Sequence, residues 1–516
     1  MLRPYPWQTT CYPAAALLAG LLTAQIIAAL QVYLSNISLY NSLSAIAQAG
    51  YLPIPNQQTM EHLREPIPAV YGGLFFTLST GAGISLLSFA AAWVWDRGFS
   101  RNPLSLVPLL LVWAGAIVAV NWKGISPMAT AYFAVIPAVV FWITLRQMPL
   151  QGPGTGWPSA LVHLTAIILL ASLWAPQLNN DIFLDFRDRL LLSNAFGAKI
   201  NDFYYRYTLY PAEVFKSLDQ KLLKTASLDS IEKKPLKALL QAKLLRHDYL
   251  PMEGKEEVDL KISESGGDLI FENKGEAILR TTPRDFLAAP AKGLRRFSLE
   301  TDRYPFFRQF TYYSLLMGFP VTLYLFLYSI LLFPLTRCVG PGTAVGTAVV
   351  LCVLSGILLL MPLWSGSGGD TEKGHPDRLL TSGRWQERVA GLKTIRQKRM
   401  DVSGFPSYQR MLASPHIPER YWLAKALSVN RGPETHEDLL RLLDDPSPSV
   451  VCMAFQSLGR RGDPRAIPEI LNRIQTSDHW YPQWYAYRAL KELGWRQGGL
   501  KQANNRIDNP LMEAYK

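Results

Sequence analysis

The sequence has few cysteines and almost no charge inside its longest apolar runs. Its four cysteines are spread over 516 residues, and no two of them form a CxxC pair. No disulfide framework or zinc-ligand spacing is visible, so cysteine usage neither requires nor excludes an oxidising compartment. The chain also has no Lys/Arg-rich tail and no recognisable nucleic-acid motif. Its formal net charge of +12 therefore indicates anionic lipid headgroups and no nucleic-acid partner.

The apolar residues are gathered in long runs. A helix that crosses a bilayer needs roughly 20 predominantly apolar residues. We expect seven such helices, at about residues 13–34, 67–94, 104–120, 128–145, 159–175, 310–335 and 343–363. Tryptophans near the ends of these runs are typical of membrane interfaces. The pattern predicts an integral multi-pass protein, which we expect in a bacterial inner membrane.

Composition then divides the chain into alternating membrane and polar blocks. We expect membrane helices one to five in residues 1–177, a soluble α+β insert in 178–305, membrane helices six and seven in 306–365, a linker in 366–379 and a helical repeat domain in 380–516. The predicted fold is mainly α, a polytopic bundle of about seven spans with an insert and a C-terminal α-solenoid. Seven spans place the two polar blocks on the same side of the membrane.

The insert changes character along its length. Pro211 is placed to open a helix over residues 212–223, and leucines on one stripe predict an amphipathic helix over 235–245. Alternating residues and turn signals then predict strands at 258–262, 269–272 and 277–281. We expect a small antiparallel sheet of about three strands.

Three carboxylates follow the fifth apolar run. Asp181, Asp185 and Asp188 share one helical face, where they are candidates for a divalent metal that holds a lipid diphosphate. The alternative interpretation, without a metal, is a solvent-exposed helix face on which Arg187 and Arg189 are neighbours of the aspartates. We favour it, because no second acidic cluster completes a set of oxygen ligands, and we expect no metal, no cofactor and no catalytic residue.

Basic residues precede the sixth run. Lys292, Arg295 and Arg296 are candidates for contact with lipid headgroups. Positive charges in short loops favour extracytoplasmic domains, but charges near the helix ends reverse this balance. We therefore expect the soluble domains in the cytoplasm.

A helical motif repeats in the C-terminal block. Gly391, Ala426, Ala454 and Ala489 each precede a large apolar residue and are separated by 35, 28 and 35 residues, a period typical of stacked solenoids. The segment 443–471, with its Asp-Pro turns and two glycines suited to helix C-termini, resembles HEAT repeats of the short type also found in phycobilin-lyase-like proteins. The resemblance covers roughly residues 380–495. It implies a protein-binding surface and carries no catalytic residues.

Aromatic residues gather in the last repeat. Trp480, Trp484 and Tyr487 are candidates for an exposed patch that binds a protein partner, although a stacked core also explains some of them. The sequence thus favours a membrane scaffold or assembly subunit whose residues 380–516 bind protein partners.

Two alternatives stay open. The first is a transporter or channel component regulated by its soluble domains. Kinked, glycine-containing spans allow it, but no acidic residue lies in the middle of a span. His163 is the ionisable group well inside a run, and we expect it to be hydrogen-bonded near the interface. The second is an interfacial enzyme acting on a lipid-linked substrate, for which the three aspartates are the support.

Overall fold

The structure is a computed structural model that describes residues 6–149, 157–177, 182–208, 210–255, 257–364, 375–430 and 432–498. The chain forms two compact units. The first unit comprises Met1–Tyr33, Ala69–Arg189 and Arg303–Ser367, and the second comprises Leu34–Pro68, Leu190–Asp302 and Gly368–Lys516. Each unit is therefore built from three separate stretches of sequence.

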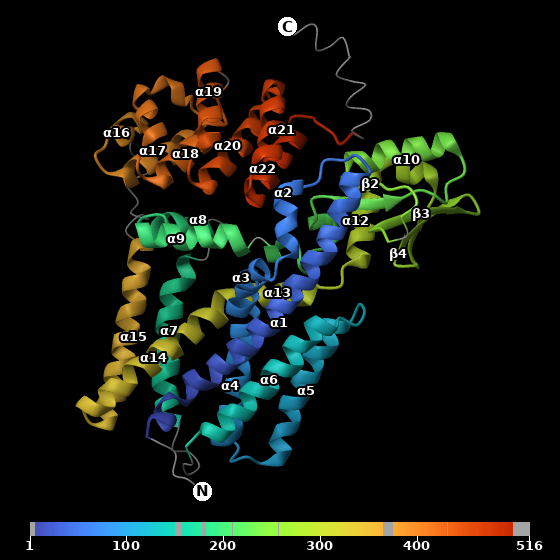
Figure 1. Cartoon of the computed structure of the whole chain (residues 1–516). Helices are drawn as coiled ribbons and strands as arrows, with labels where there is room; N and C mark the ends of the chain where they lie inside the picture. The colour runs from blue at the N-terminus through green and yellow to red at the C-terminus, as the bar shows by residue number, and fades with distance from the viewer. Residues whose placement is uncertain are drawn as a thin grey trace. The chain divides into compact units, whose positions relative to one another are not determined.

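The first unit contains the apolar helices (Figure 1). They are α1 (Pro6–Gln48), α3 (Pro66–Phe76), α4 (Ala82–Arg97), α5 (Pro103–Asn121), α6 (Pro127–Gln147), α7 (Trp157–Trp174), α13 (Pro305–Tyr313), α14 (Phe319–Cys338) and α15 (Pro341–Trp364). A short α8 (Ile182–Phe186) follows α7. The last residues of α1, from Leu34, belong to the second unit.

Six helices of the described chain are long and apolar enough to cross a membrane, where the sequence predicts seven spans. They are Cys11–Gln48, Pro66–Arg97, Pro103–Asn121, Pro127–Gln147, Pro305–Cys338 and Gly342–Leu363. The run expected at 159–175 forms a shorter apolar helix, Ala160–Trp174. Single π-helical turns at Thr77–Gly81 and Ser314–Gly318 interrupt two of the long helices.

Small residues bring those two interrupted helices together. A Cβ atom on Gly318 would lie 2.8 Å from the Cα of Gly83. The hydroxyls of Thr80 and Thr311 hydrogen-bond across the same pair at 2.8 Å. Close backbone approach of this kind stabilises helix pairs in lipid, where apolar burial gives no driving force between helices. Gly342 and Gly346 at the start of α15 also have the GxxxG spacing of close helix contacts, but both have open space where a Cβ atom would be.

The second unit contains a five-stranded mixed sheet. Its strands are β1 (Lys224–Ser227), β2 (Tyr249–Pro251), β3 (Leu260–Ser265), β4 (Asp268–Asn273) and β5 (Glu276–Thr281), in the order β2-β1-β3-β4-β5. The antiparallel pairing of β3, β4 and β5 confirms the three predicted strands. The prediction of a purely antiparallel sheet is wrong, because β1 pairs in parallel with both β2 and β3.

The two missed strands explain another error. A helix was expected over 212–223, but this stretch contains only short 3₁₀ turns, Tyr210–Glu213 and Leu218–Gln220, before β1 begins. Every residue of β1 is buried, so the strand shows no alternation of apolar and polar residues. With only four residues, its sequence carries no period that identifies it.

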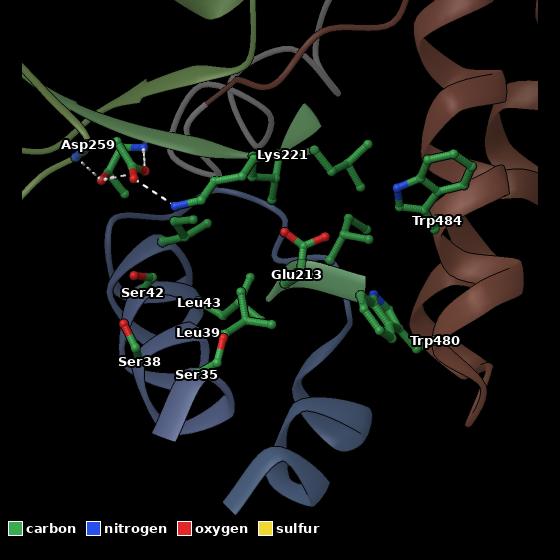
Figure 2. A pocket seen from close by; sticks show the side chains of 15 residues that line it. Ser35, Ser38, Leu39, Ser42, Leu43, Glu213, Lys221, Asp259, Trp480 and Trp484 are labelled. Atoms are coloured by element: carbon green, nitrogen blue, oxygen red, sulfur yellow. Dashed lines mark hydrogen bonds and ion pairs between the residues drawn. The ribbon is translucent and has the colours of Figure 1, made fainter. Parts of the chain in front are cut away.

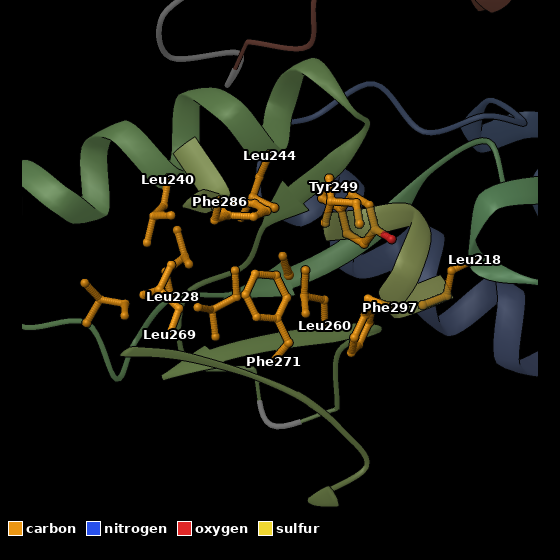
Figure 3. Packing of buried hydrophobic residues seen from close by; sticks show 14 residues of the cluster. Leu218, Leu228, Leu240, Leu244, Tyr249, Leu260, Leu269, Phe271, Phe286 and Phe297 are labelled. Carbon is orange, nitrogen blue, oxygen red and sulfur yellow. The ribbon is translucent and has the colours of Figure 1, made fainter. Parts of the chain in front are cut away.

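Three helices pack on this sheet: α10 (Lys234–Arg246), α11 (Pro283–Ala288) and α12 (Pro290–Thr301). Figure 3 shows their shared core, in which the ring of Phe271 lies 5.1 Å from Phe286 and 6.0 Å from Phe297 between ring centroids. The buried leucine stripe of α10 is narrower than the sequence predicts. Leu240 and Leu244 are fully buried, whereas Leu239 is 54% exposed.

The C-terminal block is a succession of helix pairs. Its helices are α16 (Pro376–Leu380), α17 (Trp385–Gln397), α18 (Ile417–Leu427), α19 (Pro433–Arg441), α20 (Pro448–Arg461), α21 (Ile467–Thr476) and α22 (Trp480–Glu492), with a 3₁₀ segment (Pro406–Ala413) preceding α18. The second helices of the pairs, α17, α18, α20 and α22, pack on one another in sequence order. The small residues predicted for this contact are buried: Gly391, Ala426, Ala454 and Ala489.

The two glycines of the repeat segment have different roles. Gly462 ends α20 with a φ of +73°, which confirms its predicted position at a helix C-terminus. Gly459 lies inside α20, so the same prediction for it is wrong. A Cβ atom on Gly459 would lie 2.9 Å from the Cα of Ala489 on α22. Its small size therefore permits the close crossing of α20 and α22.

Candidate functional site

Arginines with buried carboxylate partners connect successive repeats of the solenoid. Nε of Arg388 on α17 donates to the Glu419 carboxylate at 2.6 Å. Arg420 on α18 donates to Asp445 through Nε at 2.5 Å and Nη2 at 3.0 Å. Each arginine also donates to a backbone carbonyl of the turn before its own helix. This arginine ladder orders the repeats through charge-assisted, partly bidentate hydrogen bonds.

The last repeat is hydrogen-bonded to the turn between α10 and β2 in the second unit. The hydroxyl of Tyr487 on α22 donates to Oδ1 of Asp248 at 2.7 Å, and Nζ of Lys491 contacts the same oxygen at 2.8 Å. Burial, followed by the adjacent Asp248 carboxylate, raises the pKa of Tyr487 well above its ordinary value. The phenol therefore stays a hydrogen-bond donor at every physiological pH.

The aromatic residues singled out in the last repeat already have contacts within the chain. Tyr487 is fully buried and Trp480 is 7% exposed, with its ring 6.0 Å from that of Tyr210. Trp484 is partly exposed and lines a cavity described below. A partner that used Tyr487 or Trp480 would have to displace these intrachain contacts. Partner binding by Trp480, Trp484 and Tyr487 stays a prediction.

A second contact joins the last repeat to the connection between the first two long apolar helices. The side-chain amide nitrogen of Asn56, which is 6% exposed, lies 2.8, 3.0 and 2.9 Å from the carbonyl oxygens of Ile474, Gln475 and Ser477, which share its two N–H donors. The backbone N–H of Asn56 donates to Oε1 of Gln483 at 2.7 Å. The turn after α21 is thus held by one asparagine that is more than 400 residues away in sequence.

Further hydrogen bonds complete this contact. Nε2 of Gln483 donates to Oγ1 of Thr59 at 2.9 Å, and the Thr59 N–H donates back to Oδ1 of Asn56 at 2.9 Å, which caps α2 (Gln57–Met60). Gln497 exchanges two hydrogen bonds with the backbone of Leu52, at 3.0 and 2.8 Å. We call the hydrogen bonds between residues 52–59 and 474–497 the loop clasp. Sequence reasoning missed it, although Gln483, a lone amide among aromatic residues, is a signal of a buried polar partner.

The start of α22 is sensitive to protonation. His479 caps this helix, since its Nδ1 accepts the N–H of Tyr481 at 3.2 Å. Burial, followed by the positive charge of Arg206, lowers the pKa of His479 from 6.5 to about 4. Between these values the unfolded chain binds the proton more readily, so the free energy of unfolding falls as the pH falls from 6.5 toward 4.

We expect His479→Asn to flatten this pH dependence, because asparagine also caps helices and cannot be protonated. The wild-type chain should lose roughly 2 kcal/mol more than the variant between pH 7.5 and pH 5. Thermal unfolding midpoints of both proteins at these pH values measure the difference. Equal slopes for the two proteins would contradict the assignment of the cap.

A cavity of about 100 Å³ lies beside the C-terminal turns of α1 (Figure 2). Ser35, Ser38 and Ser42 line it from one face of α1, and Lys221 and Asp259 line it from the insert. The remaining lining residues are Leu39, Leu43, Ile46, Ile54, Glu213, Leu222, Leu223, Thr225, Trp480 and Trp484. A volume of this size holds about three water molecules.

The charged groups of this cavity are paired. Nζ of Lys221 lies 2.9 Å from Oδ1 of Asp259, whose other oxygen accepts the Thr225 N–H at 2.9 Å. Burial alone would raise the pKa of Asp259, but the Lys221 ammonium and the Thr225 donors hold this pKa below its ordinary value. Glu213 pairs with Lys216 at 2.5 Å. The charged side chains that line this cavity therefore neutralise one another or are neutralised by a neighbouring residue.

A second cavity, of about 310 Å³, lies between the sheet and α12. It is lined by Asp219, Lys224, His247, Tyr249, Ala291, Leu294 and Arg295. The predicted headgroup residues Lys292, Arg295 and Arg296 are all exposed on α12, and Arg295 is the one that lines this cavity. Their contact with lipid stays a prediction.

Of the three aspartates considered as metal ligands, the structure describes the side chain of Asp188. Asp181 lies outside the described residues, as does the side chain of Asp185. The Asp188 carboxylate is buried and pairs with Arg187 at 2.6 Å. In the part of the chain that the structure covers, no three His, Cys, Asp or Glu side chains are placed to hold a metal ion.

His163 lies where the sequence analysis expected a hydrogen-bonded histidine. Its Nδ1 is 2.9 Å from the hydroxyl of Tyr324 on α14. Its ring meets that of Tyr328 edge to face, with 4.4 Å between the centroids. These contacts join α7 to α14 within the first unit. They account for a histidine in an apolar helix without requiring that it contact a transported substrate.

Comparison with known proteins identifies one segment. Residues 408–491 match the family of HEAT repeats, which confirms the repeat architecture of this part of the chain. No curated protein matches the chain. No solved structure matches it either. The closer resemblance to the repeats of phycobilin-lyase-like proteins stays a prediction.

Proposed function

We propose that the chain is a polytopic membrane scaffold or assembly subunit whose HEAT repeats bind a protein partner at the bilayer surface. The loop clasp is the observation that carries this proposal. It attaches the last repeat to the short connection between two apolar helices through buried hydrogen bonds. A solenoid attached at both its linker and its last repeat holds a bound partner in a defined position.

The contacts inside the second unit also support a topology. Residues 52–59 contact the solenoid, and the solenoid contacts Asp248 of the insert, so all three segments share one side of the membrane. An even number of crossings must then separate residues 49–65 from 190–302. The three long apolar helices in this interval need a fourth crossing, which we assign to the shorter helix Ala160–Trp174. The prediction that this side is the cytoplasm is retained as part of the proposal.

The first repeats supply the surface for the partner. HEAT-type solenoids present extended surfaces on which other proteins bind. The loop clasp uses residues 474–497, at the C-terminal end of the solenoid. Charged side chains that are exposed on the preceding repeats include Arg378, Lys398, Arg399, Arg410, Glu434 and Glu437.

Affinity capture tests the proposal. We expect the full chain, tagged and extracted from its own membrane, to retain specific proteins that a chain lacking residues 371–516 loses. Because the truncated chain keeps all the long apolar helices, it should still resist extraction from membranes with alkaline carbonate. Recovery of the same proteins with both chains would show that the solenoid does not bind them and would overturn the proposal.

A further inference from the structure

The second cavity is lined by one buried cation, Lys224, and one exposed cation, Arg295. Lys224 on β1 is 7% exposed, and its Nζ lies 4.9 Å from the ring centroid of Tyr249. Among the described residues its ammonium makes one long hydrogen bond, 3.4 Å to the carbonyl of Lys221. Two of its three N–H groups therefore remain available to a ligand in the cavity.

The charges around the cavity favour an anion. The lining contains Lys224, Arg295 and one carboxylate, that of Asp219, so it carries a net positive charge. Asp248 and Asp259 also act on Lys224 electrostatically, but neither lines the cavity. Burial lowers the pKa of Lys224, and burial together with Lys224 lowers the pKa of His247. An anion between these groups would stabilise their protonated forms, because opposite charges at short range favour ionisation.

We propose that this cavity binds a phosphate group, with Lys224, His247 and Arg295 as its donors. Lysine and arginine recognise phosphate oxygens through charge-assisted hydrogen bonds. A volume of about 310 Å³ admits a phosphate and part of the molecule that carries it. The proposal adds a ligand site to the insert and does not depend on what the solenoid binds.

The position of α12 in the chain makes a lipid headgroup one source of this phosphate. This helix ends at Thr301, and the apolar helix Pro305–Cys338 begins four residues later. Four extended residues span at most about 14 Å, so the end of α12 lies near the point where the chain enters the membrane. A soluble phosphate compound has the same donor requirements and is the other source.

Neighbouring arginines on α12 provide a matched test. Arg295 lines the cavity, whereas Arg296 is exposed and does not. We would titrate the purified full chain, in phosphate-free detergent solution, with short-chain phosphatidylglycerol, short-chain phosphatidylcholine or inorganic phosphate. Native mass spectrometry reports the bound ligand and its apparent Kd.

We expect Arg295→Gln to weaken binding about tenfold and Arg296→Gln to leave it within about twofold, because Arg295 lines the cavity and Arg296 does not. Lys224→Met should weaken binding at least as much, with its fold checked by thermal unfolding. Binding of phosphatidylglycerol alone identifies a headgroup site, and binding of inorganic phosphate identifies a soluble ligand. Equal effects of the two arginine variants, or no binding of any probe, would overturn the proposal.

Discussion

Replacing Asn56 with alanine should detach the solenoid from the connection between the first two long helices. The substitution leaves the carbonyls of Ile474 and Gln475 without their side-chain donor, whereas the carbonyl of Ser477 keeps a donor, Nε2 of Gln483 at 2.7 Å. Each buried polar group that loses its partner costs about 1–3 kcal/mol. Several kcal/mol of the contact would therefore be lost, which makes this one of the two largest effects that we expect.

A cleavable linker measures this loss directly. With a protease site inserted among residues 366–374, the cut solenoid fragment should stay bound in the parent chain and dissociate in the Asn56→Ala variant. Gln57→Ala is the matched control, since Gln57 is the exposed neighbour of Asn56. Asn56→Asp separates the two roles of the residue. The Asn56→Asp substitution keeps the oxygen that caps α2 but places a second carboxylate oxygen against the three carbonyl oxygens. Because these oxygens repel one another, this variant should also release the fragment.

The Asn56→Ala result bears on function as well as stability. If the loop clasp positions a partner, the released solenoid should still bind that partner while the complex loses its attachment to residues 52–59. Retention of the fragment by Asn56→Ala would show that the remaining bonds of Gln483 and Gln497, with those of Tyr487 and Lys491 to Asp248, are sufficient to hold the last repeat.

The second large effect is expected for the arginine ladder. Arg420→Met removes a bidentate partner of Asp445, whose side chain is 3% exposed. Breaking a buried ion pair from one side costs about 3–5 kcal/mol, because the remaining charge stays buried without compensation. The loss should open α18 and its neighbours, which hydrogen exchange measures repeat by repeat.

An exposed pair in the same solenoid provides the comparison. Arg465 pairs with Asp463 at 2.6 Å, but its side chain is 69% exposed. Exposed pairs contribute about 0–1 kcal/mol, so Arg465→Met should change exchange only locally and slightly. If Arg420→Met protected or exposed the amides no more than Arg465→Met does, the ladder would not hold the repeats together.

The two effects place stability and attachment in different parts of one solenoid. The ladder uses side chains of the first three helix pairs, whereas the clasp uses the turn after α21 and residues beyond it. A variant in one should leave the other intact, since distant sites contribute independently. This separation makes it feasible to test partner binding without unfolding the repeats.

The sequence predicted correctly the helices, strands and repeats that follow from the pattern of apolar and polar residues. Apolar runs of sufficient length identified six long helices, and the spacing of Gly391, Ala426, Ala454 and Ala489 identified the stacked repeats. The alternation in 260–281 identified β3, β4 and β5. Each of these signals lies within a few turns or strands of contiguous sequence.

The errors occurred where pairing partners are distant or the element is short. β1 has four buried residues and no alternation, so only its parallel neighbours define it as a strand. Gly459 looks like a helix terminus in sequence, but its position is decided by the crossing of α20 and α22. The run at 159–175 forms a helix shorter than the length assigned to a span.

The sequence by itself indicated that the apolar runs lie in a membrane and that the C-terminal block is built of repeats. Both conclusions rest on run length and periodicity, which are properties of neighbouring residues. Only the tertiary structure decided that Asn56 holds the last repeat and that Lys224 and Arg295 share a cavity. These groups are separated in sequence by about 420 and 71 residues, respectively. No local pattern records such pairs, since the chain between them is brought together by burial of its apolar faces and by the demand of buried polar groups for partners.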